Sequence, residues 1–488
     1  MVGCANFFKR VGAEDLPPTP TTPHTTTTLA TPVSRLITQH NDKQHSTMTD
    51  TLPPPQGERH TLAAEEELRL EVPFQKQLTC TLTLQKGSCE LFGLELPLQQ
   101  PIVCVDGGLH LPLFTWHGCV VDVDCEQNDM IYTSDETEAN VSWVNTHAQL
   151  EALRETPVGP RVLVVGPPAS GKTSLVKVLT AYATKVGRTP VLVDLDVADN
   201  SLSVPGTLVA CPMHREALDL QAWATTGVPA GTTSPLALWH GDTNIQPDLF
   251  RAQVTSLGQK IQQRLKTDEW ALSSGILVNT STEDVDLIQH IVQALDISVL
   301  LVLAHDRLYS TLKKKVPNIP KLIKLPRSGG VVTPDAAHVR HGRTRSLHKY
   351  FYGDMVLPTN GDHRVPQLTP FLLQLSFSEL TLYEYSSMTL SKSLLPVAGA
   401  QMTQAVQLKR VNELTEALQS NVWAVCHPNA VAQYEASGNA QDLYTAGVAG
   451  FVVVERVLMD QERVHLLSPC AGTLSSMTLL AGKVTWME

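Results

Sequence analysis

The chain has 488 residues, too many for one ordinary hydrophobic core, so we expect two to four domains. Its formal net charge of −11 excludes a surface that is basic throughout and binds nucleic acid everywhere, although a local basic groove would not show in this sum. The nine cysteines include no C-x-x-C pair, which excludes a zinc ribbon and a compact disulfide framework, and we interpret them as reduced, mostly packed thiols. No apolar run is long enough to cross a membrane, so we expect a soluble protein without a membrane partner.

Residues 1–60 are rich in Thr and Pro and poor in aliphatic residues, as in LPPTPTTPHTTTT and LPPPQG. Such a composition buries too little apolar surface to offset the entropy lost on ordering, so we expect a disordered tail. Met48 begins a second plausible start, so residues 1–47 are either an N-terminal extension or an artefact of the assumed start.

Short alternating runs of apolar and polar residues, separated by Gly, Asp and Asn, fill residues 61–143. Alternation with period two and frequent turn residues predict an N-terminal β-sandwich domain. Helical spacing begins in VNTHAQLEALRE (144–155), where Asn145 or Thr146 is a natural N-cap. This helix would lead into a second domain, residues 144–353.

Residues 161–174, RVLVVGPPASGKTS, join a short apolar strand, a glycine-containing loop and the start of a helix. Gly166, Gly171, Lys172 and Thr173 fit the P-loop pattern G-x-x-x-x-G-K-[ST], although a simple strand-to-helix turn with a surface lysine is the alternative. In a P-loop, Lys172 would contact the β- and γ-phosphates of ATP, and the hydroxyl of Thr173 would bind Mg²⁺. The phosphate oxygens would accept hydrogen bonds from the backbone N–H groups at the helix start, those of Ala169, Ser170, Gly171, Lys172, Thr173 and Ser174.

Buried strands alternate with helical patterns through the rest of this domain. The strand candidates are 190–196, 275–279 and 297–306, and the helix candidates are 173–185, about 248–265 and 284–295. This alternation predicts a mostly parallel sheet covered on both faces, as in P-loop NTPases and kinases. After Gly353 the pattern returns to strands, with one helix at about 404–419, so we expect a separate C-terminal α/β domain, residues 354–488.

Charged residues around the predicted site allow more than one role. Asp194 and Asp196 end the strand after the P-loop helix, where one of them would hold Mg²⁺ or accept a proton, or both would simply be solvated. We expect the lysines at 313–315 to be solvated. Four further basic residues allow two interpretations equally well: Arg340, Arg343, Arg345 and Lys349. They would form either a mobile lid that pairs with phosphates or RNA, or a solvated helix face.

Several segments together resemble the polynucleotide 5′-hydroxyl kinase family, whose nuclear members belong to the pre-mRNA cleavage and polyadenylation machinery. These segments include EEELRLEV, FTWHGC, GPRVLVVGPPASGKTSLVK, LDVADNSLSVPGT, LPRSGGVV, LHKYFYG and VAGFVVVERV, and they span about residues 65–475. The resemblance implies the three domains predicted above and assigns the Walker B-like, Mg²⁺-binding and catalytic carboxylate to Asp196. It also implies that the sandwich contacts the nucleotide through Glu67 and through a basic position occupied here by His110.

The departures from the family pattern concern phosphoryl transfer. Active members resemble one another in a T-x-G-W motif that clamps the RNA end, and here that place has Thr280, Ser281, Thr282 and Glu283. A carboxylate replaces the stacking platform, so we expect ATP and Mg²⁺ to bind without catalysis, as in the fungal branch of the family. The resemblance then implies a nuclear, non-catalytic subunit that binds a scaffold and the other subunits of the cleavage and polyadenylation complex, with any contact to RNA being indirect.

Two alternatives remain open at this point. An active RNA 5′-hydroxyl kinase is supported by Lys172, Thr173 and Asp196, which the departures leave in place. A nucleotide switch of the GTPase kind is disfavoured because no N-K-x-D guanine-binding motif is present.

Overall fold

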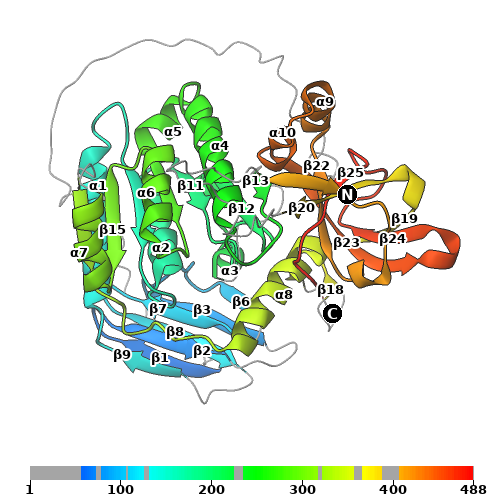
Figure 1. Cartoon of the computed structure of the whole chain (residues 1–488). Coiled ribbons are helices and arrows are strands. Elements are labelled where there is room, and N and C mark those ends of the chain that lie inside the picture. The colour runs from blue at the N-terminus through cyan, green and yellow to red at the C-terminus, as the bar shows by residue number, and fades with distance from the viewer. Residues whose placement is uncertain are drawn as a thin grey trace, which may run out of the picture.

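The computed structural model describes residues 57–72, 79–105, 108–125, 131–224, 235–316, 321–356, 365–386 and 406–486. A β-sandwich, a central α/β domain and a C-terminal β-rich domain follow one another along the chain (Figure 1). This arrangement confirms the predicted fold class. Most of the tail predicted at 1–60 lies outside the described residues, and 58–60 begin the first strand. Within the described part of the chain, no helix combines the length and the apolar character that a membrane span requires.

The sandwich consists of two antiparallel sheets whose inner faces are lined by leucine and valine. Along β3 and β8, alternate residues such as Leu82, Leu84, Val121 and Val123 are buried, which is the period-two pattern seen in the sequence. The first sheet has the order β1 (Glu58–Leu62), β8 (Cys119–Cys125), β3 (Thr79–Gly87), β6 (Pro101–Val105). The second has the order β5 (Leu94–Glu95), β4 (Glu90–Leu91), β7 (His110–Phe114), β2 (Glu67–Glu71), β9 (Ile131–Ser134).

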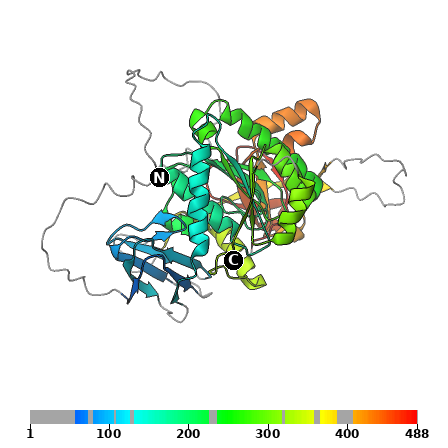
Figure 2. The ribbon, with the colours of Figure 1, turned by 90° about the vertical axis from the view of Figure 1, so that its left-hand side faces the viewer.

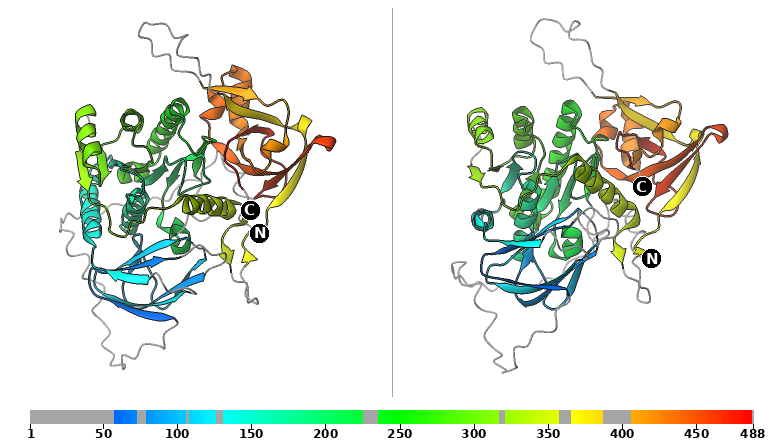
Figure 3. Two further views of the ribbon diagram at one scale, coloured as in Figure 1. Left: turned by 60° about the horizontal axis from the view of Figure 1, so that its bottom comes forward. Right: turned by 90° about the horizontal axis from the view of Figure 1, so that it is seen from below.

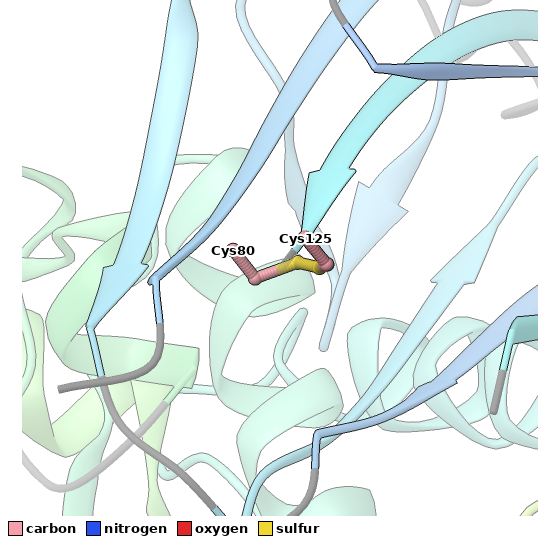
Figure 4. The surroundings of a disulfide bond; sticks show 2 residues. All are labelled: Cys80 and Cys125. Carbon is pink, nitrogen blue, oxygen red and sulfur yellow. A yellow bond between two sulfur atoms is a disulfide. The ribbon is translucent and has the colours of Figure 1, made fainter. Parts of the chain in front are cut away.

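A disulfide joins Cys80 on β3 to Cys125 on β8 (Figure 4). The two residues are direct partners in the antiparallel register of β3 and β8, and their Cα atoms are 4.3 Å apart. The prediction that all cysteines are reduced is therefore wrong for this pair. A separation of 45 residues gave no hint of it, because only the strand pairing brings the two side chains together.

The central domain is built on a seven-stranded sheet, parallel from β11 to β16 and extended by two antiparallel strands. Every residue of β10 and β15 is buried, as expected for strands covered by helices on both faces. The strand order is β13 (Leu236–Trp239), β12 (Thr207–Pro212), β11 (Val191–Asp194), β14 (Ile276–Asn279), β10 (Arg161–Val165), β15 (Val299–Leu303), β16 (Lys321–Leu325). The helices are α1 (Glu138–Leu153), α2 (Lys172–Lys185), α3 (Leu220–Ala224), α4 (Pro247–Leu265), α5 (Glu269–Ser274), α6 (Val285–Ala294), α7 (Asp306–Lys315) and α8 (Ala336–Tyr352).

Helix α1 begins earlier than the sequence pattern indicated. Its N-cap is Thr137, so the prediction that Asn145 or Thr146 caps a helix starting at 144 is wrong. Ala139 and Trp143 are buried on α1, so tertiary packing extends the helix towards the sandwich. In Figure 2, α1 runs in cyan along the central domain and down to the blue sandwich.

The C-terminal domain is a seven-stranded sheet in which only β20 and β25 pair in parallel. The helix predicted at about 404–419 is wrong, because the described residues there form a strand that pairs with β20 and a single 3₁₀ turn, Glu416–Leu418. The strand order is β19 (Phe371–Ser376), β24 (Arg463–Ser468), β23 (Val448–Leu458), β22 (Val422–Cys426), β25 (Thr478–Leu480), β20 (Thr381–Ser386), β21 (Gln407–Arg410). The remaining elements are α9 (Pro428–Ser437), α10 (Gln441–Tyr444) and the small hairpin β17 (Met355–Val356) and β18 (Val365–Pro366).

The sandwich contacts helices α2 and α3 of the central domain through β4 and the residue that follows it. The Tyr182 hydroxyl of α2 donates to the carboxylate of Glu90, and Trp223 Nε1 donates to the carbonyl oxygen of Phe92 over 3.3 Å. Lys177 on α2 is buried, with its ammonium above the rings of Phe92 and Trp223. Seen from below, the sandwich lies against the central domain, and α8 runs between it and the C-terminal domain (Figure 3). These contacts hold the sandwich over the carboxyl ends of the parallel strands.

Candidate nucleotide-binding site

A pocket of about 580 Å³ lies between the sandwich and the central sheet. Three parts of the chain supply most of its lining: strands β2 and β7 of the sandwich, the loop between β10 and α2 with the start of α2, and the segment that leads into α8. Its volume falls in the usual range for sites that bind a small molecule or cofactor. The carboxyl edge of a parallel sheet is also where such folds place their ligands.

The loop between β10 and α2 has the backbone shape of an anion-binding P-loop. Gly171, the N-cap of α2, has a φ of 89°, a left-handed conformation that disfavours any side chain. Ala169 shares this conformation with a φ of 52°. At Gly166 a Cβ would lie 2.9 Å from the carbonyl oxygen of Leu303, so only glycine fits between the loop and β15. The backbone N–H groups at the start of α2 are thus available to a bound anion.

Two polar side chains of the loop fit a phosphate ligand. Lys172 is buried, and its Nζ donates to the carbonyl oxygens of Gly166 and Pro167 over 2.9 and 2.7 Å. Burial lowers the pKa of Lys172, while the charges of Asp196 and Glu283 oppose this shift. Ser170 Oγ is buried without a hydrogen-bond partner among the described residues. A phosphate group would supply both the counter-charge for Lys172 and an acceptor for Ser170.

A hydrogen-bonded chain orients the hydroxyl of Thr173. Asn279, the last residue of β14, donates from Nδ2 to Thr173 Oγ1 over 3.3 Å and to Asp194 Oδ1 over 3.0 Å. Asp194 is fully buried and also accepts two hydrogen bonds from Ser201. Burial, followed by the charge of Asp196, raises the pKa of Asp194 to about 7. Asp194 therefore acts on the site through Asn279, by holding the Thr173 side chain in place.

Of the two aspartates Asp194 and Asp196, it is Asp196 that lines the pocket. It accepts hydrogen bonds from the backbone N–H groups of Ala198 and Asp199, which fix the turn after β11. Burial and the charge of Asp199 raise the pKa of Asp196, and these hydrogen bonds oppose the shift. The described residues contain no group of three or more His, Cys, Asp or Glu side chains able to hold a metal. Thr173 and Asp196 would therefore bind Mg²⁺ only together with phosphate and water oxygens, as is usual for this ion.

Glu67 faces the P-loop from β2 as half of a buried ion pair. Its Oε1 accepts from Arg69 Nε over 2.7 Å, and its Oε2 accepts from Asn140 Nδ2 on α1 over 3.3 Å. The segment before α8 passes directly over this pair, because a Cβ on Gly330 would lie 2.9 Å from Arg69 Nε. The next residue, Val331, contacts Gly171 of the P-loop. Sandwich, P-loop and the α8 segment thus meet at one point beside the pocket.

His110 on β7 also lines the pocket, but its ring is held by a second histidine. It stacks on His338 of α8, with ring centroids 5.0 Å apart and planes inclined by 10°. Burial lowers the pKa of His110 and that of His338, and the nearby charge of Arg345 lowers both further. The nearby charge of Glu71 opposes the shift at His110, but the net change favours the neutral ring at the basic position that the resemblance implied.

The basic residues of α8 belong to a formed helix. Arg343 Nε donates to the carbonyl oxygen of Ala198 over 3.0 Å, which ties α8 to the turn that carries Asp196. Lys349 pairs with Asp354 at 3.0 Å, beyond the end of the helix. The predicted lid role is not tested by these contacts and stays a prediction.

The turn at 280–283 contains no aromatic side chain. Thr280 and Thr282 are buried, and each hydroxyl oxygen accepts a backbone N–H two residues further on, over 3.4 and 3.2 Å. Asp284 then caps α6. Glu283 is exposed, and its charge acts on Lys172. The turn thus satisfies its own hydrogen bonds as it leads into α6, and it presents an exposed carboxylate at Glu283.

Sequence comparison assigns the chain to a family. Its residues 61–156, 166–353 and 368–488 match, in turn, the N-terminal beta-sandwich domain of polyadenylation factor, the mRNA cleavage and polyadenylation factor CLP1 P-loop, and the pre-mRNA cleavage complex II protein Clp1. The CLP1 homolog of Arabidopsis thaliana is 30% identical over 448 residues, which cover 88% of this chain and 94% of that protein. The chain belongs to the Clp1 family. The resemblance found from the motifs is thereby confirmed.

Other relatives carry two kinds of name. The mRNA cleavage and polyadenylation factor clp1 of Botryotinia fuckeliana is 30% identical, covering 88% of this chain and 93% of that protein. The polyribonucleotide 5′-hydroxyl-kinase Clp1 of Homo sapiens is also 30% identical, covering 88% of this chain and 96% of that protein. The relatives thus include both an mRNA-processing factor and a kinase.

Solved structures share the fold of this Clp1-family chain. The complex of wild-type Clp1p with a Pcf11p fragment superimposes with a TM-score of 0.73 at 22% identity, covering 89% of this chain and 99% of that one. A second structure gives 0.74 at 22% identity, covering 88% and 100%, and is described as an extended Pcf11p–Clp1p interface with a structural basis for ATP loss in a glycine-to-arginine mutant.

The site residues predicted from the sequence converge in space. Glu67, His110 and Asp196 line one pocket with the P-loop residues Ala169, Ser170, Gly171, Lys172, Thr173 and Ser174, while Gly166 forms the turn beneath. Their roles towards ATP and Mg²⁺ remain predictions. Sequence reasoning missed Arg69, Asn279 and His338. Only Asn279 left a signal, as the polar end of the buried run GILVN beside the P-loop strand.

Proposed function

We propose that this Clp1-family chain is an ATP-binding, non-catalytic subunit of the nuclear pre-mRNA 3′-end cleavage and polyadenylation complex. The observation that carries the proposal is the three-walled pocket, in which the sandwich, the P-loop and the α8 segment all border the same space. A triphosphate held by Lys172 and the α2 N-terminus would touch each wall. Bound ATP would therefore lock the sandwich onto the central domain and fix the surface offered to a partner.

The residues present support ATP with Mg²⁺ as the ligand. When bound, Mg²⁺ would neutralise phosphate charge, and Thr173 and Asp196 are the side chains that would hold it. Asn279 and Asp194 keep the Thr173 hydroxyl in position, and Ser170 offers a buried hydroxyl to the phosphates. A scaffold of the Pcf11 type is the proposed partner, because the Clp1p structures that share this fold are complexes with Pcf11p.

The absence of catalysis is proposed from the turn at 280–283. Phosphoryl transfer depends on holding the acceptor in line with the γ-phosphate, and this turn offers no aromatic ring on which a terminal base could stack. The exposed carboxylate of Glu283 would in addition repel an RNA phosphate.

An active RNA 5′-hydroxyl kinase is the second candidate. It is favoured by one observation, that Lys172, Thr173 and Asp196 stand together in the pocket as transfer requires. Purified protein incubated with labelled ATP and an RNA bearing a 5′-hydroxyl distinguishes the two functions. Bound ATP without labelled RNA supports the first, and labelled RNA that depends on Lys172 supports the second.

A further inference from the structure

A strongly basic surface lies at the edge of the central sheet, on α7 and β16. Residues 306–327 contain seven basic residues and one acidic residue, in a chain whose net charge is −11. All seven cations are exposed, and they are Arg307, Lys313, Lys314, Lys315, Lys321, Lys324 and Arg327. We call these seven residues the α7–β16 surface. In Figure 1, α7 stands at the outer left edge of the central domain, far from the C-terminal domain.

Three of the seven cations line an open depression of about 460 Å³ on one side of α7. Its lining residues are Arg307, Ser310, Thr311, Lys314 and Lys315. Leu308 and Leu312 occupy the opposite side and are buried in the core. Residues 307, 311 and 314 follow one another at helical spacing, so their side chains form a line along about 10 Å of helix.

Charge neutralisation within the chain does not account for this surface. The acidic residue of the segment, Asp306, pairs with Lys324. In the described part of the chain, Lys313, Lys314, Lys315 and Lys321 form no ion pair. Several unpaired cations therefore remain on one face of an acidic protein, and this favours a polyanionic ligand.

Local stability explains only part of the pattern. Lysines in the last turn of α7 interact favourably with the helix dipole, and lysines on the edge strand β16 discourage sheet-to-sheet aggregation. Neither effect explains Arg307, which lies in the first turn of α7, where the dipole disfavours a cation. Neither explains why Arg307, Lys314 and Lys315 line one open depression together with two hydroxyl groups.

We propose that the α7–β16 surface binds the phosphate backbone of RNA. An acidic protein would be the other class of ligand, but protein interfaces are anchored by apolar and aromatic side chains in a dry centre. Among the described residues of 306–327, no large hydrophobic side chain is exposed. Point-like lysine charges with two hydroxyl groups between them suit a phosphate chain without base specificity.

The inference rests on the proposed function only for the identity of the polyanion. It adds a direct RNA contact to a subunit for which the sequence indicated only an indirect one. The α7–β16 surface shares no residue with the lining of the nucleotide pocket, so RNA binding here does not require ATP.

The test measures binding of the full chain to a fluorescent 20-nucleotide oligouridylate by anisotropy at several salt concentrations. The variant is Lys314→Gln with Lys315→Gln, and the matched control is Lys409→Gln with Arg410→Gln, two exposed cations on β21 in the C-terminal domain. The variant should raise Kd on the order of tenfold at 0.1 M salt and flatten the salt slope by about 1.4, because two phosphate contacts are lost. The control should change Kd by less than about twofold. Since all four side chains are exposed, both proteins should keep the wild-type melting temperature.

Three further outcomes decide the inference. Crosslinking of 4-thiouridine RNA to the peptides of 306–327 in the wild-type protein would support it, and crosslinks confined to other segments would overturn it. The inference would also be overturned if the variant and the control weakened RNA binding equally, or if neither weakened it. Poly-glutamate and unlabelled RNA are compared as competitors of the labelled RNA. If poly-glutamate displaces it at the lower concentration of charge, the surface binds an acidic protein instead. All of these measurements are made without added ATP, so failure here is separate from failure of the ATP-binding function.

Discussion

Replacing both Lys172 and Thr173 by Ala should abolish ATP binding and with it the stability that bound ATP adds. Lys172 supplies the only buried cation of the P-loop, Gly166–Thr173, and Thr173 holds the hydroxyl positioned by Asn279. At an ATP concentration about a hundred times Kd, binding stabilises the folded state by about 2.7 kcal/mol. The sandwich and central domain together have about 300 residues, so their unfolding entropy is about 0.6 kcal/mol/K and the expected rise in melting temperature is about 4 °C.

Thermal unfolding of protein from which bound nucleotide has been removed, with and without added Mg-ATP, measures this shift. The wild-type protein should gain about 4 °C, and the double variant should gain nothing and bind a Pcf11-type scaffold more weakly. Lys185→Ala, on the last turn of the same helix and partly exposed, is the matched control and should keep the full shift. A double variant that loses ATP but binds the scaffold with unchanged affinity would refute the structural role of the nucleotide.

Further predictions concern the tail, a metal-positioning residue and an interface carboxyl. Deleting residues 1–47 should leave the melting temperature and scaffold binding unchanged, whereas a clear drop in melting temperature would show that the tail docks. Asn279→Ala should weaken ATP binding about tenfold in titrations with Mg²⁺, because the Thr173 hydroxyl loses the hydrogen bond that positions it. ATP binding in EDTA should be unaffected, and equal losses in both conditions would contradict this role. Burial raises the pKa of Glu90 to about 7, so the stability due to its neutral form is complete below about pH 4.5 and is lost as pH rises through 7. The free energy of unfolding of Glu90→Gln, measured in urea titrations, should therefore rise relative to that of the wild type by up to about 3 kcal/mol between about pH 4.5 and 7.5. A difference between the two proteins that does not vary with pH would contradict the assignment.

The elements that the sequence predicted well are those with strong local signals. The P-loop has glycines at fixed positions, and β10 and β15 are apolar runs that can only be buried strands. The prediction of a helix at about 404–419 was wrong because the helical spacing of Val411, Leu414 and Leu418 is misleading there. Pairing with β20 overrides that spacing and uses 407–410 as an edge strand.

The part of the site that escaped prediction depends on tertiary contacts. In the sequence, Arg69 is only a polar residue on a strand. Its place in the site depends on packing against Gly330, which is 261 positions later in the chain. His338 belongs to an unremarkable helix until the sandwich brings His110 onto its ring. No local pattern marks such pairs, because each partner has its function only when the sandwich, the P-loop and α8 have assembled.

The most direct test of the account measures binding and transfer on the same purified protein. We predict that the protein contains ATP and Mg²⁺ after chromatography and transfers no labelled γ-phosphate to an RNA bearing a 5′-hydroxyl. The residues proposed to bind ATP lie in the pocket, and the turn at 280–283 contains no aromatic side chain on which an acceptor base could stack. A stacked base contributes about 1 to 3 kcal/mol and a misplaced acceptor costs about a hundredfold in rate, so transfer should fall below detection. Phosphorylated RNA that appears with the wild-type protein and disappears with Lys172→Ala would contradict the account.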